Sequence, residues 1–167
     1  MTDDLSRHPA VARVLAALAE RGLSPQVRYL PDAVRTAQAA ADALGITPAE
    51  IANSLIFAAI DDEGAASPLL VMASGGHRVD TAFLAARLGL ARLDRADPDF
   101  VRRHTGMTIG GVAPIGHPAP IRTIVDTDLE PFAHVWAAGG HSHTVFETTY
   151  AELLAMTLGA PHPVAGA

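Results

Sequence analysis

Two residue types are missing from this chain of 167 residues, and each absence removes a class of chemistry. Without cysteine there are no disulfides, no thiolate nucleophile and no thiolate-bound zinc or iron–sulfur cluster. All twelve basic residues are arginine, so no lysine is present to form a Schiff base, complete a Walker-type phosphate loop or act as a general base. Arginine does not replace lysine as a base, because its guanidinium stays protonated.

Other features are scarce rather than absent. Aromatic residues make up 5% of the chain, so aliphatic side chains must supply the core. No apolar run approaches the roughly 20 residues that span a bilayer. The polar, acidic opening MTDDLSRHP is unlike a secretory signal peptide. We therefore expect a cytoplasmic protein without a membrane partner.

The formal net charge of −6 argues against a non-specific nucleic-acid binder, and DNA is not expected as a partner. An acidic protein can still contact the end of an RNA. Five arginines lie close together in the sequence: Arg87, Arg92, Arg95, Arg102 and Arg103. They fit either solvated helix faces or an RNA-facing patch, and both interpretations stay open.

The length fits one domain, residues 1–167, with a core over about 8–159 and a frayed Ala/Pro/Gly tail at 160–167. Apolar periodicity, capping residues and terminating glycines predict helices at 11–21, 37–44, 47–50, 81–88, 99–104 and 150–158. Apolar runs between turns predict strands at 26–30, 54–60, 68–73, 121–125, 134–137 and 144–148. The tight turn at 61–64 makes the second and third strands a hairpin. These elements indicate a mixed or barrel-like α/β domain rather than a doubly wound one.

Four segments, in order and with plausible gaps, resemble the YbaK-like aminoacyl-tRNA deacylases and the related editing domain of bacterial prolyl-tRNA synthetases. They are RTA at 35–37, IANSLIF at 51–57, SGGHRVD at 74–80 and TGMTIGGVAPIG at 105–116. The resemblance implies an α/β single domain with a mixed, mostly antiparallel barrel-like sheet and surrounding helices. It also implies hydrolysis of the ester between a wrong amino acid and the acceptor end of a tRNA. No cofactor and no metal are implied.

The fourth segment matches the family's Gly-x-x-x-Pro loop. Glycine allows a backbone to approach a ligand closely, and free N–H groups stabilise an oxyanion or carbonyl. By resemblance, we assign catalytic roles to Gly110 and Gly111, and substrate binding to Pro114 with Gly116 in support.

The sequence departs from the family at Asn53, where the family usually has a lysine. An amide offers a donor and an acceptor but no charge. Charge-assisted hydrogen bonds are about twice as strong as neutral ones. Replacing the lysine with asparagine therefore corresponds to a loss of about 1–2 kcal/mol in substrate binding or transition-state stabilisation. Asn53 is interpreted as a catalytic pocket residue, with a helix-terminal cap as the alternative. Ser54 has no evident His–Asp partner for a nucleophilic triad.

Further substrate contacts are expected at His117, which follows the loop, and at Thr36, Gly76 and Gly140. Thr36 fits a helix cap at least as well as a ligand contact. His141 and His143 have the i, i+2 spacing of a strand metal site, but the sequence nominates no third ligand.

Three functions follow. The leading one is a free-standing trans-editing deacylase of a mischarged tRNA, since the length leaves no room for synthetase modules. The second is a catalytically silent YbaK-like module that binds tRNA or nucleotides, because the family lysine is Asn53. The third, a metal-dependent hydrolase on another substrate, rests only on the histidines.

Overall fold

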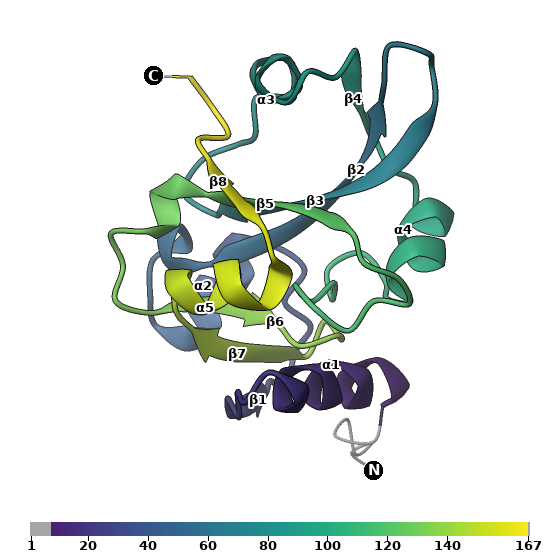
Figure 1. The fold of residues 1–167 in the computed structure, drawn as a ribbon. Coiled ribbons are helices and arrows are strands. Elements are labelled where there is room, and N and C mark those ends of the chain that lie inside the picture. The colour runs from purple at the N-terminus through teal and green to yellow at the C-terminus, as the bar shows by residue number, and fades with distance from the viewer. Residues whose placement is uncertain (1–7, 167) are drawn as a thin grey trace.

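The computed structural model describes residues 8–166 as two sheets with helices packed around them (Figure 1). Chain order is α1 Pro9–Glu20, β1 Val27–Tyr29, α2 Ala37–Leu44, η2 Pro48–Glu50, β2 Ala52–Ile60, β3 Ala66–Ser74, α3 Thr81–Leu88, β4 Arg92–Arg95, α4 Pro98–Thr105, β5 Arg122–Asp126, η3 Thr127–Leu129, β6 Val135–Ala138, β7 Thr144–Thr148, α5 Tyr150–Thr157 and β8 Ala160–His162, where η marks a 3-10 helix. No helix in this part of the chain is both long and apolar enough to cross a membrane.

The larger sheet has the order β4-β2-β3-β5-β8 and the smaller one the order β1-β7-β6. Pairing is antiparallel except at β3/β5 and β5/β8. A single parallel bridge between Ile51 and Trp136 connects the two sheets. The predicted mixed, mostly antiparallel, barrel-like sheet is therefore confirmed, although the barrel does not close.

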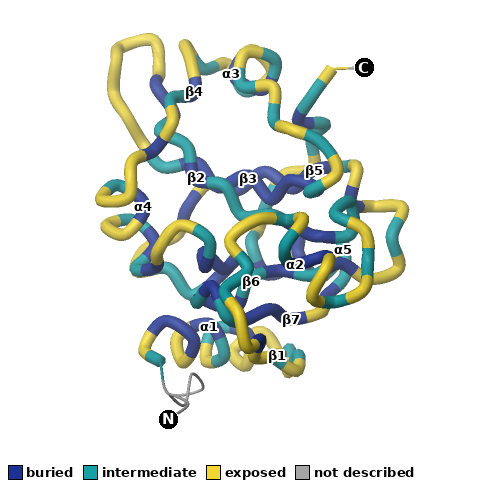
Figure 2. Tube along the Cα trace, turned by 180° about the vertical axis from the view of Figure 1, so that it is seen from behind, coloured by how far each residue is buried: buried dark blue, intermediate teal, exposed yellow. Residues whose placement is uncertain are grey.

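The main core fills the space between the sheets, and a second cluster packs on the other face of the larger sheet. Phe146, Leu70 and Met72 are buried in the first cluster, where α1 and α5 also pack. Leu69 of β3 and Leu84 of α3 are buried in the second. Figure 2 shows the second part of β3, residues 69–74, buried and the outer turns of the helices exposed. Aliphatic side chains dominate both clusters, as the low aromatic content requires.

Local signals place most elements correctly. α2 and α3 have the predicted bounds, and β7 also matches its predicted range. The hydroxyl of Thr36 accepts from Ala39 N–H at 3.1 Å, and the carboxylate of Asp80 accepts from Phe83 N–H at 3.0 Å. These caps satisfy N–H groups that a first helical turn leaves free.

Two expectations need correction. Residues 160–164 of the tail are packed on the fold, because β8 pairs in parallel with β5 and Val164 is fully buried. The sequence also gave no sign of β4, so Arg92 and Arg95 lie on a strand rather than on a helix face. Both strands are short and depend on pairing with partners distant in sequence, so their formation reflects tertiary context rather than local preference.

Candidate functional site

A cleft opens where the start of β2 meets the glycine-rich loop at 108–113 and the β6–β7 hairpin. It holds about 440 Å3, including its open mouth. Its lining residues are Val34, Arg35, Thr36, Ala37, Ala40, Ile51, Ala52, Asn53, Ser54, Gly110, Val112, Trp136, Ala137, Ala138, Thr144 and Val145. We call it the Asn53 cleft. Three residues selected from the sequence, Thr36, Asn53 and Gly110, therefore lie around one cavity.

Asn53 and Ser54 are adjacent but differ in what their polar atoms do. The Asn53 side chain is half-buried and makes no hydrogen bond to another described residue, so its amide is available to a ligand. The Ser54 hydroxyl donates to the Met72 sulfur at 3.3 Å. Because no histidine lines the cleft, Ser54 lacks the base that a serine nucleophile needs.

The glycines of the loop are required by close packing. Gly110 has φ +93°, and a Cβ there would lie 2.9 Å from Cγ of Arg35. A Cβ on Gly111 would lie 2.8 Å from the carbonyl carbon of His141. Glycine therefore lets the loop approach both the entrance to α2 and the β6–β7 turn.

The N–H groups of the loop are not equivalent. Gly111 N–H donates to Thr108 O at 3.0 Å, and Ala113 N–H points to the Met107 sulfur at 3.3 Å. Within the described chain, the N–H groups of Gly110 and Val112 have no acceptor. The loop thus leaves two donors for a ligand, and Gly111 contributes through packing.

Arg35 is the one charged residue among those that line the cleft. Its side chain is exposed, and no carboxylate in residues 8–166 pairs with it. Neither a carboxylate nor a histidine lines the cleft, so its walls provide cationic and neutral polar groups but no general base.

The remaining residues selected from the sequence lie elsewhere. Pro114, Gly116 and His117 line a separate hollow between α1 and the end of α5. A Cβ on Gly140 would meet the backbone of Ala10, and one on Gly76 would meet Ala49.

His117 is half-buried at the wall of this hollow. Its Nε2 donates to Ala113 O at 2.8 Å. Burial lowers the pKa of His117, and the hydrogen bond to Ala113 opposes that effect only in part. The neutral ring, protonated on Nε2, is therefore the form that this site favours.

His141 and His143 lie beside the cleft rather than in it. The Nδ1 of His141 accepts from His143 N–H at 3.1 Å, and the Nδ1 of His143 donates to Leu30 O at 3.0 Å. Burial, followed by the charges of His8, His143 and Arg35, lowers the pKa of His141. In the described residues no third ligand completes a metal site with this pair.

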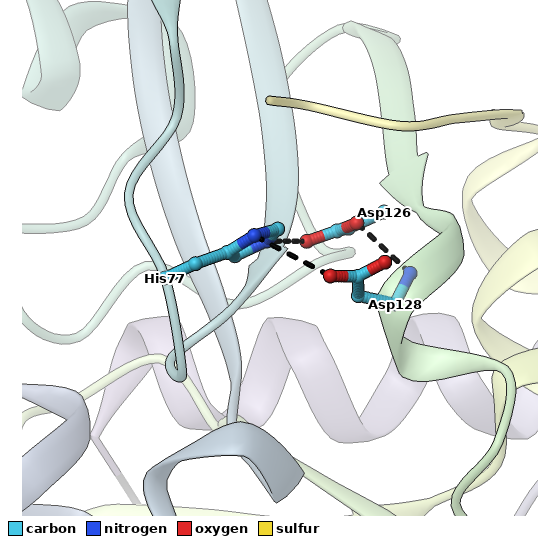
Figure 3. A group of neighbouring side chains, drawn as sticks. All are labelled: His77, Asp126 and Asp128. Carbon is cyan, nitrogen blue, oxygen red and sulfur yellow. Dashed lines mark hydrogen bonds and ion pairs between the residues drawn. The ribbon is translucent and has the colours of Figure 1, made fainter. Parts of the chain in front are cut away.

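A different group has metal-ligand spacing: atoms of His77, Asp126 and Asp128 lie within 4.8 Å of one another (Figure 3). His77 Nε2 contacts Asp126 Oδ2 at 2.5 Å, and Nδ1 lies 3.4 Å from Asp128 Oδ2. The oxygens of Asp126 also accept from Ser74 N–H and Asp128 N–H, both at 2.9 Å. Both carboxylate oxygens are thus engaged within the fold.

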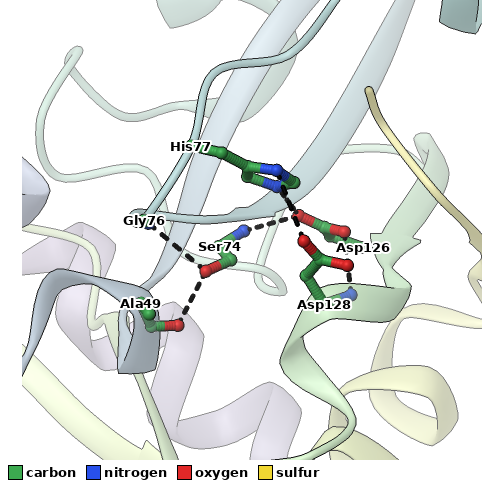
Figure 4. Close-up of polar contacts among 6 residues, drawn as sticks. All are labelled: Ala49, Ser74, Gly76, His77, Asp126 and Asp128. Carbon is green, nitrogen blue, oxygen red and sulfur yellow. Dashed lines mark hydrogen bonds and ion pairs between the residues drawn. The ribbon is translucent and has the colours of Figure 1, made fainter. Parts of the chain in front are cut away.

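This group is not a Ser–His–Asp triad either. The hydroxyl of Ser74 donates to Ala49 O at 2.7 Å, while both ring nitrogens of His77 face carboxylates (Figure 4). The cluster links the end of β3 to η2 and η3, so its geometry serves to hold these segments together.

Arg35 belongs to the first resembling segment, RTA at 35–37, but was given no role of its own. Sequence reasoning missed two further residues of the cleft. Trp136 and Thr144 come from β6 and β7, and only the pairing of the two sheets brings them to Asn53.

Comparison with known proteins agrees with this architecture. Residues 31–156 match the model of the aminoacyl-tRNA editing domain. YwhH of Bacillus subtilis (strain 168), an uncharacterized protein, is 31% identical over 71% of this chain and 72% of its own length. Proline–tRNA ligase of Thermoanaerobacter sp. (strain X514) is 31% identical over 67% of this chain, which spans only 19% of the ligase.

Solved structures extend the match to nearly the whole chain. A protein proposed as a trans-editing enzyme for prolyl-tRNA synthetase has a TM-score of 0.83 and 37% identity, covering 95% of this chain and 98% of that one. The hypothetical protein APE2540 has a TM-score of 0.80 and 28% identity over 92% of this chain and 99% of that one. Sequence and fold together show that the chain belongs to the aminoacyl-tRNA editing domain family, as a YbaK-like member.

Proposed function

We propose that the chain is a trans-acting deacylase that hydrolyses the ester between a wrong amino acid and the acceptor end of a tRNA. The observation that carries this proposal is the placement of the unpartnered Asn53 amide and the free N–H groups of Gly110 and Val112 around one cleft. The neighbour of similar length that is proposed as a trans-editing enzyme supports action in trans.

The donors of the loop suit the reacting carbonyl. An ester carbonyl that hydrogen-bonds to Gly110 and Val112 N–H becomes more electrophilic, and the same donors stabilise the oxyanion that forms on attack. One such donor is worth about 10²–10³ in rate. The Asn53 amide, with a donor and an acceptor, positions the attacking water.

Arg35 supplies the positive charge that Asn53 lacks. It lies at the mouth of the same cleft without a carboxylate partner, so its guanidinium can pair with a phosphate of the tRNA end. In this chain the positive charge therefore lies at the rim of the cleft, whereas the family usually has it on the pocket wall, as lysine.

A catalytically silent binding module is the second candidate. It is favoured by one observation, the absence of any carboxylate or histidine among the residues that line the cleft. Such a module would bind the aminoacyl end without turnover.

The test is release of amino acid from a panel of mischarged tRNAs carrying residues of graded size. Wild type should deacylate at least one of them, and Arg35→Gln should lower kcat/KM on that tRNA about tenfold. Arg102→Gln, an exposed arginine of α4 outside the cleft, is the matched control. Binding without release in every case would decide for the silent module.

A further inference from the structure

A second and larger groove continues from the Asn53 cleft. It holds about 1000 Å3, including its open mouth, and shares Ser54, Gly110 and Val112 with that cleft. The remaining lining residues are Leu55, Ile56, Phe57, Thr81, Leu93, Arg95, Ala96, Val101 and Ile109. We call it the Arg95 groove. The two hollows therefore meet at the residues around which the ester would react.

The groove follows an unpaired stretch of strand. β3 pairs with β2 over its full length, but β4 pairs only with residues 57–60 on the other edge. On that side, residues 53–56 have no hydrogen-bonded strand partner in the described chain, and β6 approaches only the start of β2, through the bridge between Ile51 and Trp136. At about 3.3 Å per residue, the open edge measures about 13 Å. Two hollows in a row along a free edge suit an extended ligand.

The charge of the groove favours an anionic ligand. Arg95 is its one charged lining residue, and no carboxylate lines it. Arg95 is exposed and unpaired among residues 8–166, whereas the neighbouring Arg92 donates to both oxygens of Asp94 at 2.9 and 3.1 Å. Asp97 is also engaged, since it caps α4 by accepting from Phe100 N–H. Arg95 is therefore the guanidinium free to bind a phosphate.

The rest of the wall is apolar. Leu55, Phe57 and Val101 contribute aliphatic and aromatic surface, and Ile109 projects from the glycine-rich loop with 53% of its surface exposed. An exposed isoleucine beside an unpaired arginine fits a ligand that carries flat apolar faces on an anionic backbone, as single-stranded RNA does.

We propose that the Arg95 groove binds the single-stranded RNA segment that precedes the aminoacylated terminal nucleotide. Its bases lie on the apolar wall, and one of its phosphates pairs with Arg95. This assignment rests on the proposed function and adds the partner's path across the protein: from the ester at Gly110, along the open edge of β2, to β4.

The experiment compares Arg95→Gln with the matched control Arg92→Gln. The probes are an uncharged RNA minihelix with a single-stranded 3′ end, its aminoacylated form, and an aminoacyl-adenosine without phosphates. Binding of the uncharged minihelix is measured across a salt series. Arg95→Gln should weaken it about tenfold and reduce the salt slope by about one, because one phosphate contact is lost. Arg92→Gln should behave as wild type.

Kinetics separate this inference from the proposed function. Arg95→Gln should raise KM for the aminoacylated minihelix more than KM for aminoacyl-adenosine. If wild type hydrolyses neither ester, the proposed function fails, while the binding and salt measurements still decide the inference. Unchanged minihelix affinity and salt slope in Arg95→Gln would overturn it and leave the open strand edge to a peptide ligand.

Discussion

The protein contains two polar regions, one around Asp126 and one around Asn53, and they use their polar atoms in opposite ways. Around Asp126, which is 0% exposed, each carboxylate oxygen accepts a hydrogen bond and both nitrogens of His77 face carboxylates. Around Asn53, the side-chain amide, two backbone N–H groups and a guanidinium have no partner in the described chain. Buried polar groups cost stability unless they are bonded, so the first region indicates structure and the second indicates a ligand site.

The largest effect is expected from a substitution in the region around Asp126. Asp126→Asn replaces one acceptor oxygen of a fully buried side chain with an NH2 group. Either Asp128 N–H loses its acceptor Oδ1, or Ser74 N–H loses its acceptor Oδ2, which His77 also contacts. We expect a loss of about 3 kcal/mol in the free energy of unfolding. Urea denaturation measures it.

The control for that variant is Asp128→Asn, which changes the other carboxylate near the same histidine. Asp128 is largely exposed, so its loss should cost less than about 1 kcal/mol. Equal losses in the two variants would show that burial does not distinguish these carboxylates.

Gly111→Ala tests whether activity in the Asn53 cleft depends on the close approach of the glycine-rich loop to the β6–β7 turn. The added Cβ would lie 2.8–2.9 Å from backbone atoms of His141 and Ser142, so the loop must move. Misplacement of a reacting group by about 1 Å lowers the rate about 100-fold. We therefore expect kcat/KM for the mischarged tRNA that wild type hydrolyses to fall by that order. Gly166→Ala, where the new Cβ meets only ordinary contacts with Phe83, is the control. An unchanged rate in Gly111→Ala would separate the loop from the chemistry.

Local and tertiary information explain why prediction succeeded in one place and stopped in another. Thr36, Asp80 and Thr149 each cap the helix that follows them. Such a cap involves only a few consecutive residues, so it can be predicted from the local sequence. β4 and β8 are set by strands distant in sequence and left no local pattern.

The same division holds for the site. Resemblance selected Asn53 and Gly110, which line one cleft. His117, seven residues after Gly110, lines another hollow, and the intervening Gly116 packs against Val14 of α1. The pair His77 and Asp126 is separated by 49 residues, so neither position signals the other in sequence.

Asn53→Lys tests the neutral wall of the Asn53 cleft. It restores the ammonium group that the family usually has, beside the guanidinium of Arg35. A charge-assisted hydrogen bond should change kcat/KM on the tRNA panel about tenfold, as a gain or as a shift between substrates. Ser67→Lys, on the exposed start of β3, controls for added charge. An unchanged panel would remove Asn53 from the ligand site.

The smallest effect is expected from His117, a single half-buried ring outside both regions. Its pKa is lowered by burial, so below pH 6.5 the unfolded chain binds a proton that the folded site resists. The stability that neutral His117 contributes is thus present above pH 6.5 and is lost as the pH falls through its folded pKa. His117→Gln keeps a donor for Ala113 O but does not titrate, so the drop in urea midpoint between about pH 7 and about pH 5 should shrink. His134→Gln, which removes an exposed ring, should keep the wild-type drop. If both variants keep it, the acid sensitivity belongs to other groups, and the hollow of His117 has no part in it.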